Sequence, residues 1–157
     1  MRNLFGKALI ALAFTTVAAF GADNSLGTWK FSPEKSKYTP APIPLKSLTV
    51  TREAAEGGVK VTNAGERADG TKIDSGYTAK YDGSASSVSG TGAPYDMISI
   101  KQVNANTFTD ERKKTGGSYQ AAGRLVISGG GKIMTWTSKG TDPDGKPFTA
   151  VLVYEKQ

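Results

Sequence analysis

The stretch "TKIDSGYTAKYDG", residues 71–83, shows the pattern that decides the fold. Its odd-numbered positions from Ile73 to Tyr81 are apolar or small, whereas the even-numbered positions between them are mostly charged or polar. Alternation with a period of two indicates a β-strand with one face in water and the other packed inside. The Asp82-Gly83 pair that follows favours a tight turn, because glycine readily adopts the positive φ angles of hairpin loops.

Similar short runs rich in Val, Ile, Thr, Tyr and Phe follow one another along the chain, separated by turn residues such as Asp69-Gly70 and Asp144-Gly145. Loops this short make consecutive strands antiparallel neighbours, and closing the sheet removes its exposed edges. The sequence therefore predicts an all-β fold, an antiparallel up-and-down β-barrel of about 8–10 strands. We expect these strands at 27–32, 46–53, 58–66, 71–81, 85–90, 96–103, 106–115, 118–128, 132–139 and 147–156.

A proline-rich segment, residues 33–44, interrupts this pattern. Proline lacks a backbone donor and fixes φ, which argues against a helix or a central strand. We expect an extended segment that crosses one end of the barrel. It is either a rigid connection between the first two strands or a lid over the barrel mouth.

The first 21 residues have the three parts of a secretory signal peptide. Arg2 and Lys7 give a positive start, Ala8 to Phe20 is an apolar run, and small residues precede a cut after Gly21. A membrane anchor is the rival interpretation, but a spanning helix needs about 20 apolar residues. We expect an exported protein, periplasmic or secreted, whose mature chain does not span a membrane. Residues 22–157 then form a single barrel domain.

The chain contains neither His nor Cys, and its formal net charge is +6. These absences exclude His-based metal sites, catalysis by Ser-His-Asp or Cys-His, and disulfides. No compact basic motif suggests nucleic acid. The run "TDPDGK", residues 141–146, lacks the acidic end of a calcium loop and predicts a hairpin turn. We expect no enzyme, metal or cofactor, and the oligomeric state stays open.

Several aromatic residues fall on strand faces that we expect to point inward. Tyr77, Trp136 and Tyr154 could line an amphipathic pocket, with rings for apolar contact and hydroxyl groups for directed hydrogen bonds. The alternative is an ordinary filled core, because small barrels fill their interiors with side chains. The sequence does not decide between the two.

The densest charge run is "DERKK", residues 110–114. In a strand, Arg112 lies on the same face as Phe108, so an inward Phe108 would bring a cation inside. A buried cation needs a partner or an anionic ligand. The alternative places this stretch at the barrel rim, with its charges in water. Our candidate ligand-binding residues are Tyr77, Phe108, Arg112, Trp136 and Tyr154.

The opening Gly27-Thr28-Trp29-Lys30 and the closing "VLVYEKQ", residues 151–157, resemble the ends of lipocalins and fatty-acid-binding proteins. The chain after residue 21 also resembles a group of exported bacterial lipocalin-like proteins of unassigned function. The shared elements here are "GTWKFSPEKSKYTP", "YTAKYDG", "APYDMISIKQVNANT", "GTDPDGKPF" and "VLVYEKQ". This resemblance implies a lipocalin-like barrel but no particular function.

The fatty-acid-binding resemblance implies a carboxylate anchor made by an Arg and a Tyr on the last strand. The tyrosine position matches Tyr154, but Leu152 stands where the Arg would be, so this anchor is not carried over. We therefore expect a barrel that binds a small apolar or amphipathic ligand. The alternative is a structural or protein-interaction module, for example one of inhibitor type, with a packed interior and no small-molecule ligand.

Overall fold

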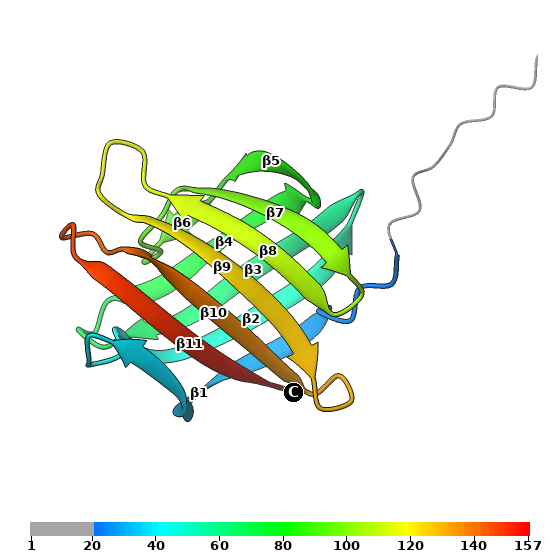
Figure 1. Cartoon of the computed structure of the whole chain (residues 1–157), viewed down its shortest axis with the longest axis horizontal. Coiled ribbons are helices and arrows are strands. Elements are labelled where there is room, and N and C mark those ends of the chain that lie inside the picture. Colours follow the sequence, from blue (N-terminus) through cyan, green and yellow to red (C-terminus); the bar gives the residue numbers. More distant parts are fainter. Residues whose placement is uncertain (1–20) are drawn as a thin grey trace, which may run out of the picture.

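The computed structural model describes residues 21–157, and the predicted signal peptide lies almost wholly outside them. The chain forms one antiparallel sheet of eleven strands that curls into a nearly closed barrel (Figure 1). The strands are β1 Gly27–Thr39, β2 Leu45–Ala55, β3 Gly58–Arg67, β4 Lys72–Lys80, β5 Asp82–Ser87, β6 Ser89–Thr91, β7 Met97–Asn104, β8 Thr107–Lys113, β9 Gln120–Ser128, β10 Ile133–Thr141 and β11 Pro147–Lys156. The predicted all-β, up-and-down barrel is confirmed, with one strand more than expected because residues 82–91 divide into two.

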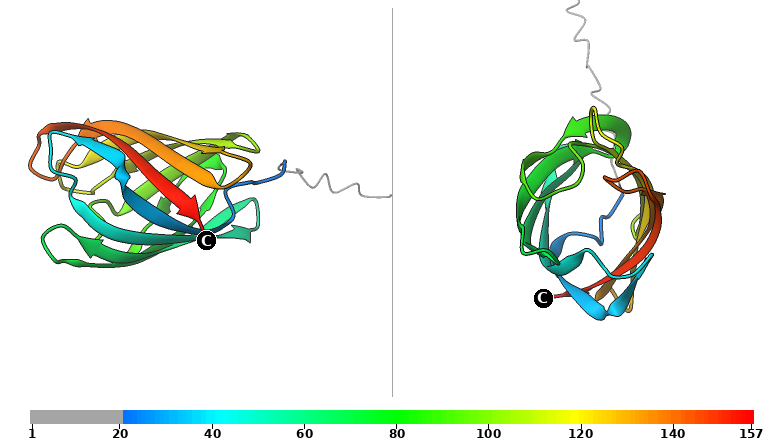
Figure 2. Two further views of the ribbon diagram at one scale, coloured as in Figure 1. Left: turned by 90° about the horizontal axis from the view of Figure 1, so that it is seen from below. Right: turned by 90° about the vertical axis from the view of Figure 1, so that its left-hand side faces the viewer.

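The alternation in β4 places the core as the sequence predicts. Ile73, Ser75, Tyr77 and Ala79 are buried, while Lys72, Asp74, Thr78 and Lys80 are exposed. The inward faces of the other strands add the remaining apolar side chains, which pack into one main cluster. The sheet curls around the interior, as the view along the barrel shows (Figure 2, right).

The expected pairing of consecutive strands fails at β5 and β6. The sheet order is β5-β7-β8-β9-β10-β11-β1-β2-β3-β4-β6, so β5 pairs with β7 and β6 pairs with β4. The chain crosses this seam at Tyr81, whose amide donates to the Gly57 carbonyl at 2.9 Å and whose carbonyl accepts from the Gln102 amide at 3.4 Å. Tyr81 thus joins the two sides of the barrel directly.

The proline-rich segment is more ordered than predicted. β1 continues to Thr39, and its pairing with β11 jumps from Ser32–Val153 to Lys37–Val151. The extra residues 33–36 form a bulge. Pro33 fits there because a bulged residue makes no inter-strand hydrogen bond and so needs no backbone N–H group. The Ser36 hydroxyl replaces a backbone acceptor at the bulge, since it accepts a hydrogen bond from the Val153 amide at 2.8 Å. Only residues 40–44 connect β1 to β2 outside the sheet.

The chain before β1 closes one end of the barrel. The Asn24 amide donates to the Ala105 carbonyl at 2.9 Å, and the Trp29 indole donates to the Ser25 carbonyl at 2.8 Å. Trp29 is fully buried at this end. No helix within residues 21–157 has the length and apolar character needed to cross a membrane.

The turn between β10 and β11 is the hairpin that the sequence predicts at residues 141–146. Asp142 caps it, because its carboxylate accepts from the amides of Asp144 and Lys146, both at 2.9 Å. The Asp142 carboxylate is therefore engaged by backbone donors.

Candidate functional site

The barrel interior contains a small central cavity of about 30 Å³. Polar and aromatic side chains line it together. The polar ones come from three different strands: Arg52 of β2, Asn63 of β3 and Asp110 of β8. The aromatic ones are Tyr77, Tyr95, Phe108 and Trp136.

A buried ion pair lies beside this cavity. Arg112 donates from Nε to Asp110 Oδ1 at 2.8 Å, and both side chains are almost fully buried. The guanidinium also donates to the Tyr119 hydroxyl at 3.2 Å and lies 4.4 Å from the Trp136 ring centroid. Burial acts to lower the pKa of Arg112, but Asp110 and the neighbouring tyrosines more than offset it, so this pKa is raised. Arg112 is therefore a permanently charged part of the interior.

Glycine makes this arrangement possible at one position. Asp110 Oδ2 accepts from the Trp136 indole nitrogen at 2.7 Å, and Gly123 faces this hydrogen bond from β9. A Cβ atom at Gly123 would lie 2.5 Å from Trp136 Nε1 and 2.6 Å from Asp110 Oδ2. Only glycine leaves room for the bond.

A second buried cation, Arg52 of β2, also lines the cavity. Its Nε donates to the Ser25 hydroxyl at 3.0 Å, and its guanidinium lies 5.7 Å from the Phe108 ring centroid. Ser25 in turn donates to Asp23, which also accepts from the Tyr81 hydroxyl. Arg52 is thus linked to the acidic Asp23 only through a serine hydroxyl.

Four aromatic rings cover the end of the barrel that lies opposite Trp29. Tyr38 stacks on Phe148 at 5.4 Å, Phe148 on Tyr119 at 6.0 Å, and Tyr119 on Tyr95 at 5.9 Å between ring centroids. Tyr95 and Tyr119 belong to loops rather than strands. We call these four residues the ring cover. Its two loops are tied together, because Asp96 accepts from the Thr115 amide at 2.9 Å.

The interior environment acts strongly on the tyrosines. Burial is the main cause that raises the pKa of Tyr77 and Tyr95 at the cavity, and of Tyr119 in the ring cover. The neutral hydroxyl is therefore the state that faces the cavity, and it can both donate and accept a hydrogen bond.

The structure brings most of the predicted site residues together. Tyr77, Phe108 and Trp136 all line the central cavity, and Arg112 packs against it through Trp136. Arg112 is only 8 % exposed, so the alternative of a solvated charge at the rim is wrong. Tyr154 does not line the cavity. It lies in the core towards the Trp29 end, where the centroids of its ring and the Phe31 ring are 5.7 Å apart.

Sequence reasoning missed four residues that matter here: Arg52, Asn63, Tyr95 and Asp110. Arg52 could have been found, because it follows Leu48 and Val50 at a period of two on an apolar strand face. Asp110 shares the face of Phe108 and Arg112 by the same rule. Tyr95 lies in a loop, where no periodicity predicts orientation.

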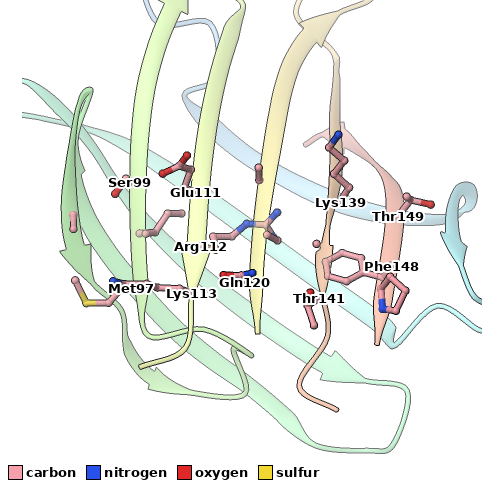
Figure 3. Close-up of a pocket in the computed structure, with 16 residues that line it drawn as sticks. Met97, Ser99, Glu111, Arg112, Lys113, Gln120, Lys139, Thr141, Phe148 and Thr149 are labelled. Carbon is pink, nitrogen blue, oxygen red and sulfur yellow. The ribbon is translucent and has the colours of Figure 1, made fainter. Parts of the chain in front are cut away.

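The outer surface carries a broader depression across β7 to β11, shown in Figure 3. Strand register aligns one lateral row of side chains over it, namely Ser99, Glu111, Ala122, Lys139 and Thr149. The small side chain of Ala122 lies in the middle of this row, between the acidic Glu111 and the basic Lys139. This surface is exposed and mixed in charge.

Comparisons with known proteins give a limited result. No protein-family model matches the sequence, and no curated protein matches it. Among solved structures, the chain is similar to a redesigned β-barrel, mFAP1, in a complex with DFHBI. The identity is 16 % and the TM-score 0.41, over 82 % of this chain and 94 % of the other. A likeness at this level carries no argument about function.

Proposed function

We propose that this protein binds a small amphipathic molecule inside its barrel. The observation that carries the proposal is the central cavity, where aromatic rings and polar groups face one space. Binding sites for small molecules combine apolar walls with a few directed polar groups in this way. As it stands, the cavity of about 30 Å³ takes only a group the size of a water molecule. The rest of the ligand therefore needs the ring cover to move.

The ring cover is suited to such a movement, because two of its four rings are carried by loops. Tyr95 lies in the loop that follows Gly92, and Tyr119 in the loop that contains Gly116, and both glycines have positive φ. Loops open more easily than paired strands, and lids of this kind commonly gate binding sites. Movement of Tyr95 would uncover Trp136 and Arg112 beneath it, which adds an aromatic wall to the site.

The test is a titration with N-phenyl-1-naphthylamine, a neutral dye whose fluorescence rises in apolar surroundings. Val61 lines the cavity, and the adjacent Thr62 points outward. We expect saturable binding by the wild type and by Thr62→Phe. Val61→Phe fills the cavity and should weaken binding about tenfold or more, since it removes buried apolar contact.

Circular dichroism of each variant shows whether the barrel is intact, and Asn63→Leu serves as a second filling variant if Val61→Phe does not fold. Equal binding by filled and control variants would place the dye on the outer surface. Absence of saturable binding by folded wild type would overturn the proposal.

A second candidate function is favoured by the same small cavity volume. A barrel interior packed to ordinary density suits a structural or protein-interaction module that works through its surface. The depression over β7 to β11 is then the surface to examine. Failure of all apolar probes to bind would favour this candidate.

We propose export and the absence of catalysis as parts of the same function. The contacts of Ala22 and Asp23 support a mature chain that begins there, because the Ala22 carbonyl accepts from Gln102 at 3.0 Å and Asp23 accepts from Tyr81. Mass spectrometry of protein recovered from the periplasm or medium should give Ala22 or Asp23 as the first residue, whereas intact Met1–Gly21 would contradict export.

A binding role without catalysis is supported by Asp110, whose carboxylate is occupied by Arg112 and Trp136.

A further inference from the structure

The two buried arginines of the interior differ in how well they are compensated. Arg112 has a carboxylate partner, a hydroxyl partner and two aromatic rings. Arg52 donates to one hydroxyl, that of Ser25, lies against one ring, and is close to the Tyr77 hydroxyl. Within residues 21–157, no carboxylate lies within ion-pair distance of Arg52. The charge of Arg52 is therefore the one that lacks a direct counter-ion.

Arg52 also has an unused donor. Its Nη2 atom is buried and has no hydrogen-bond partner in the described part of the chain, and its side chain is only 5 % exposed. Buried donors are normally paired, and a buried charged group without a partner is strongly unfavourable. Arg112 Nη2 is likewise unpaired, but Arg112 does not line the cavity, whereas Arg52 does.

The buried charges do not balance. Two fully buried cations, Arg52 and Arg112, face a single fully buried anion, Asp110, and the half-buried Asp23 reaches Arg52 only through Ser25. One negative charge placed in the cavity would give Arg52 a direct counter-ion. Asp110 lines the same cavity and repels a group with two negative charges more strongly than a group with one, which favours a monoanion. The volume of about 30 Å³ is enough for one oxygen of a carboxylate, and the rest of the group enters when the ring cover moves.

We infer that the ligand is an amphipathic monoanion whose charged group is held by Arg52 in the central cavity. This inference rests on the proposed function and specifies its ligand class. Arg52 Nη2 donates to the anionic group, and the neutral hydroxyl of Tyr77 at the same cavity supplies a second donor. The apolar part of the ligand extends towards Trp136 and the ring cover. Arg112 stays bound to Asp110 and shapes the wall.

The free protein already offers a first test. Replacing Arg52 by methionine keeps much of its length and leaves no carboxylate without a partner, because Ser25 still donates to Asp23. We therefore expect the unliganded Arg52→Met variant to be as stable as the wild type or more stable. Arg112→Met should be clearly less stable, because it leaves the buried carboxylate of Asp110 without its ion-pair partner. A loss of stability in Arg52→Met as large as that in Arg112→Met would show that Arg52 is a structural residue and overturn the inference.

The second test compares decanoate with 1-decanol as competitors of N-phenyl-1-naphthylamine. The two molecules share an alkyl chain and differ in charge. The wild type should bind decanoate about tenfold or more tightly than decanol, as expected for a hydrogen bond to a buried charged group. Arg52→Met should lose this preference, so that decanoate and decanol compete about equally with the dye. Arg124→Met changes an exposed arginine on β9 and should keep the preference.

The outcomes separate the two proposals. Dye binding without a preference for decanoate overturns the anionic ligand and leaves the interior site standing. A preference that survives in Arg52→Met also overturns the role of Arg52. No dye binding by folded wild type overturns the proposed function, and the inference with it. Arg52→Gln replaces the methionine variant if that variant does not fold.

Discussion

The Trp136 indole donates a 2.7 Å hydrogen bond to Asp110, and the two side chains meet directly over Gly123. Three strands contribute to this contact, β8, β9 and β10, and the missing side chain of Gly123 is what lets the other two meet. The same carboxylate holds Arg112 through its other oxygen. A buried acidic group is thus satisfied on both sides inside an apolar barrel, which is how such groups are tolerated.

We expect Gly123→Ala to destabilise the barrel by about 1–3 kcal/mol, the usual cost of forcing an extra group into a packed interior. The new methyl group would separate Trp136 from Asp110, so tryptophan emission should change as well. Equilibrium unfolding in urea with fluorescence detection measures both effects. Ala122→Ser alters the exposed neighbour on the same strand and should change stability by less than about 0.5 kcal/mol. Equal stabilities of the two variants would contradict the crowding at Gly123.

The buried ion pair should show strong coupling between its members. Arg112→Met leaves Asp110 without its charge partner and should cost about 3–5 kcal/mol. Adding Asp110→Leu removes the unpaired buried carboxylate, so the double variant should recover part of the lost stability. A double-mutant cycle in urea gives the coupling energy. Strictly additive effects would mean that the two groups do not depend on each other.

Trp29→Ala should cost about 3–5 kcal/mol, as is typical when a fully buried large aromatic side chain is deleted. The indole fills the closed end and donates to the Ser25 carbonyl, and no disulfide compensates for its loss. The denaturation midpoint measures the effect. Val103→Ala, at a position that is 56 % exposed, is the control. An unchanged midpoint for Trp29→Ala would show that the end of the barrel is closed by other groups.

The six tyrosines should resist ionisation as long as the barrel is folded. Burial raises the pKa of every one of them above its ordinary value of 10.0, namely Tyr38, Tyr77, Tyr81, Tyr95, Tyr119 and Tyr154. The folded state therefore retains these protons at a pH where the unfolded chain releases them. This contribution to stability is complete below about pH 10 and is lost as the pH rises further.

Ultraviolet absorbance of tyrosinate measures this behaviour directly. In the folded protein, the absorbance should rise only above pH 10, and the rise should coincide with unfolding. The same chain in concentrated guanidinium chloride should titrate near the ordinary value and serves as the control. A folded protein in which several tyrosines ionise at pH 10 would contradict the burial of these hydroxyl groups.

Local pattern was enough to predict the barrel and most inward positions. Alternation in β4 predicted the buried face from Ile73 to Ala79. In β8 the shared face of Phe108 and Arg112 left an interior cation and a solvated rim position as alternatives, and the structure shows the interior one. A period of two is a property of the strand itself, so it needs no knowledge of neighbours. Turn residues likewise marked most strand ends.

Pairing between distant strands could not be predicted in this way. The separation of β5 from β6 follows from their pairing with different strands, β5 with β7 and β6 with β4, and alternation within each strand does not encode these partners. Tyr154 was expected at the ligand site because its face points inward, but its height along the barrel follows from the register with Phe31. The level of a residue inside a barrel is set by strand register, which alternation alone leaves free.

The pairing of β1 with β11 also determines how the protein folds. Ser36 and Val153 are bonded although they lie 117 positions apart, so the barrel cannot close until the last strand is present. Before that, β1 and β10 present unpaired edges, which makes the incomplete chain prone to aggregation. All-β proteins with such distant pairings fold in about milliseconds to seconds. Closure between the first and last strands should therefore be a late and slow step, and a chain shortened before β11 should fail to fold.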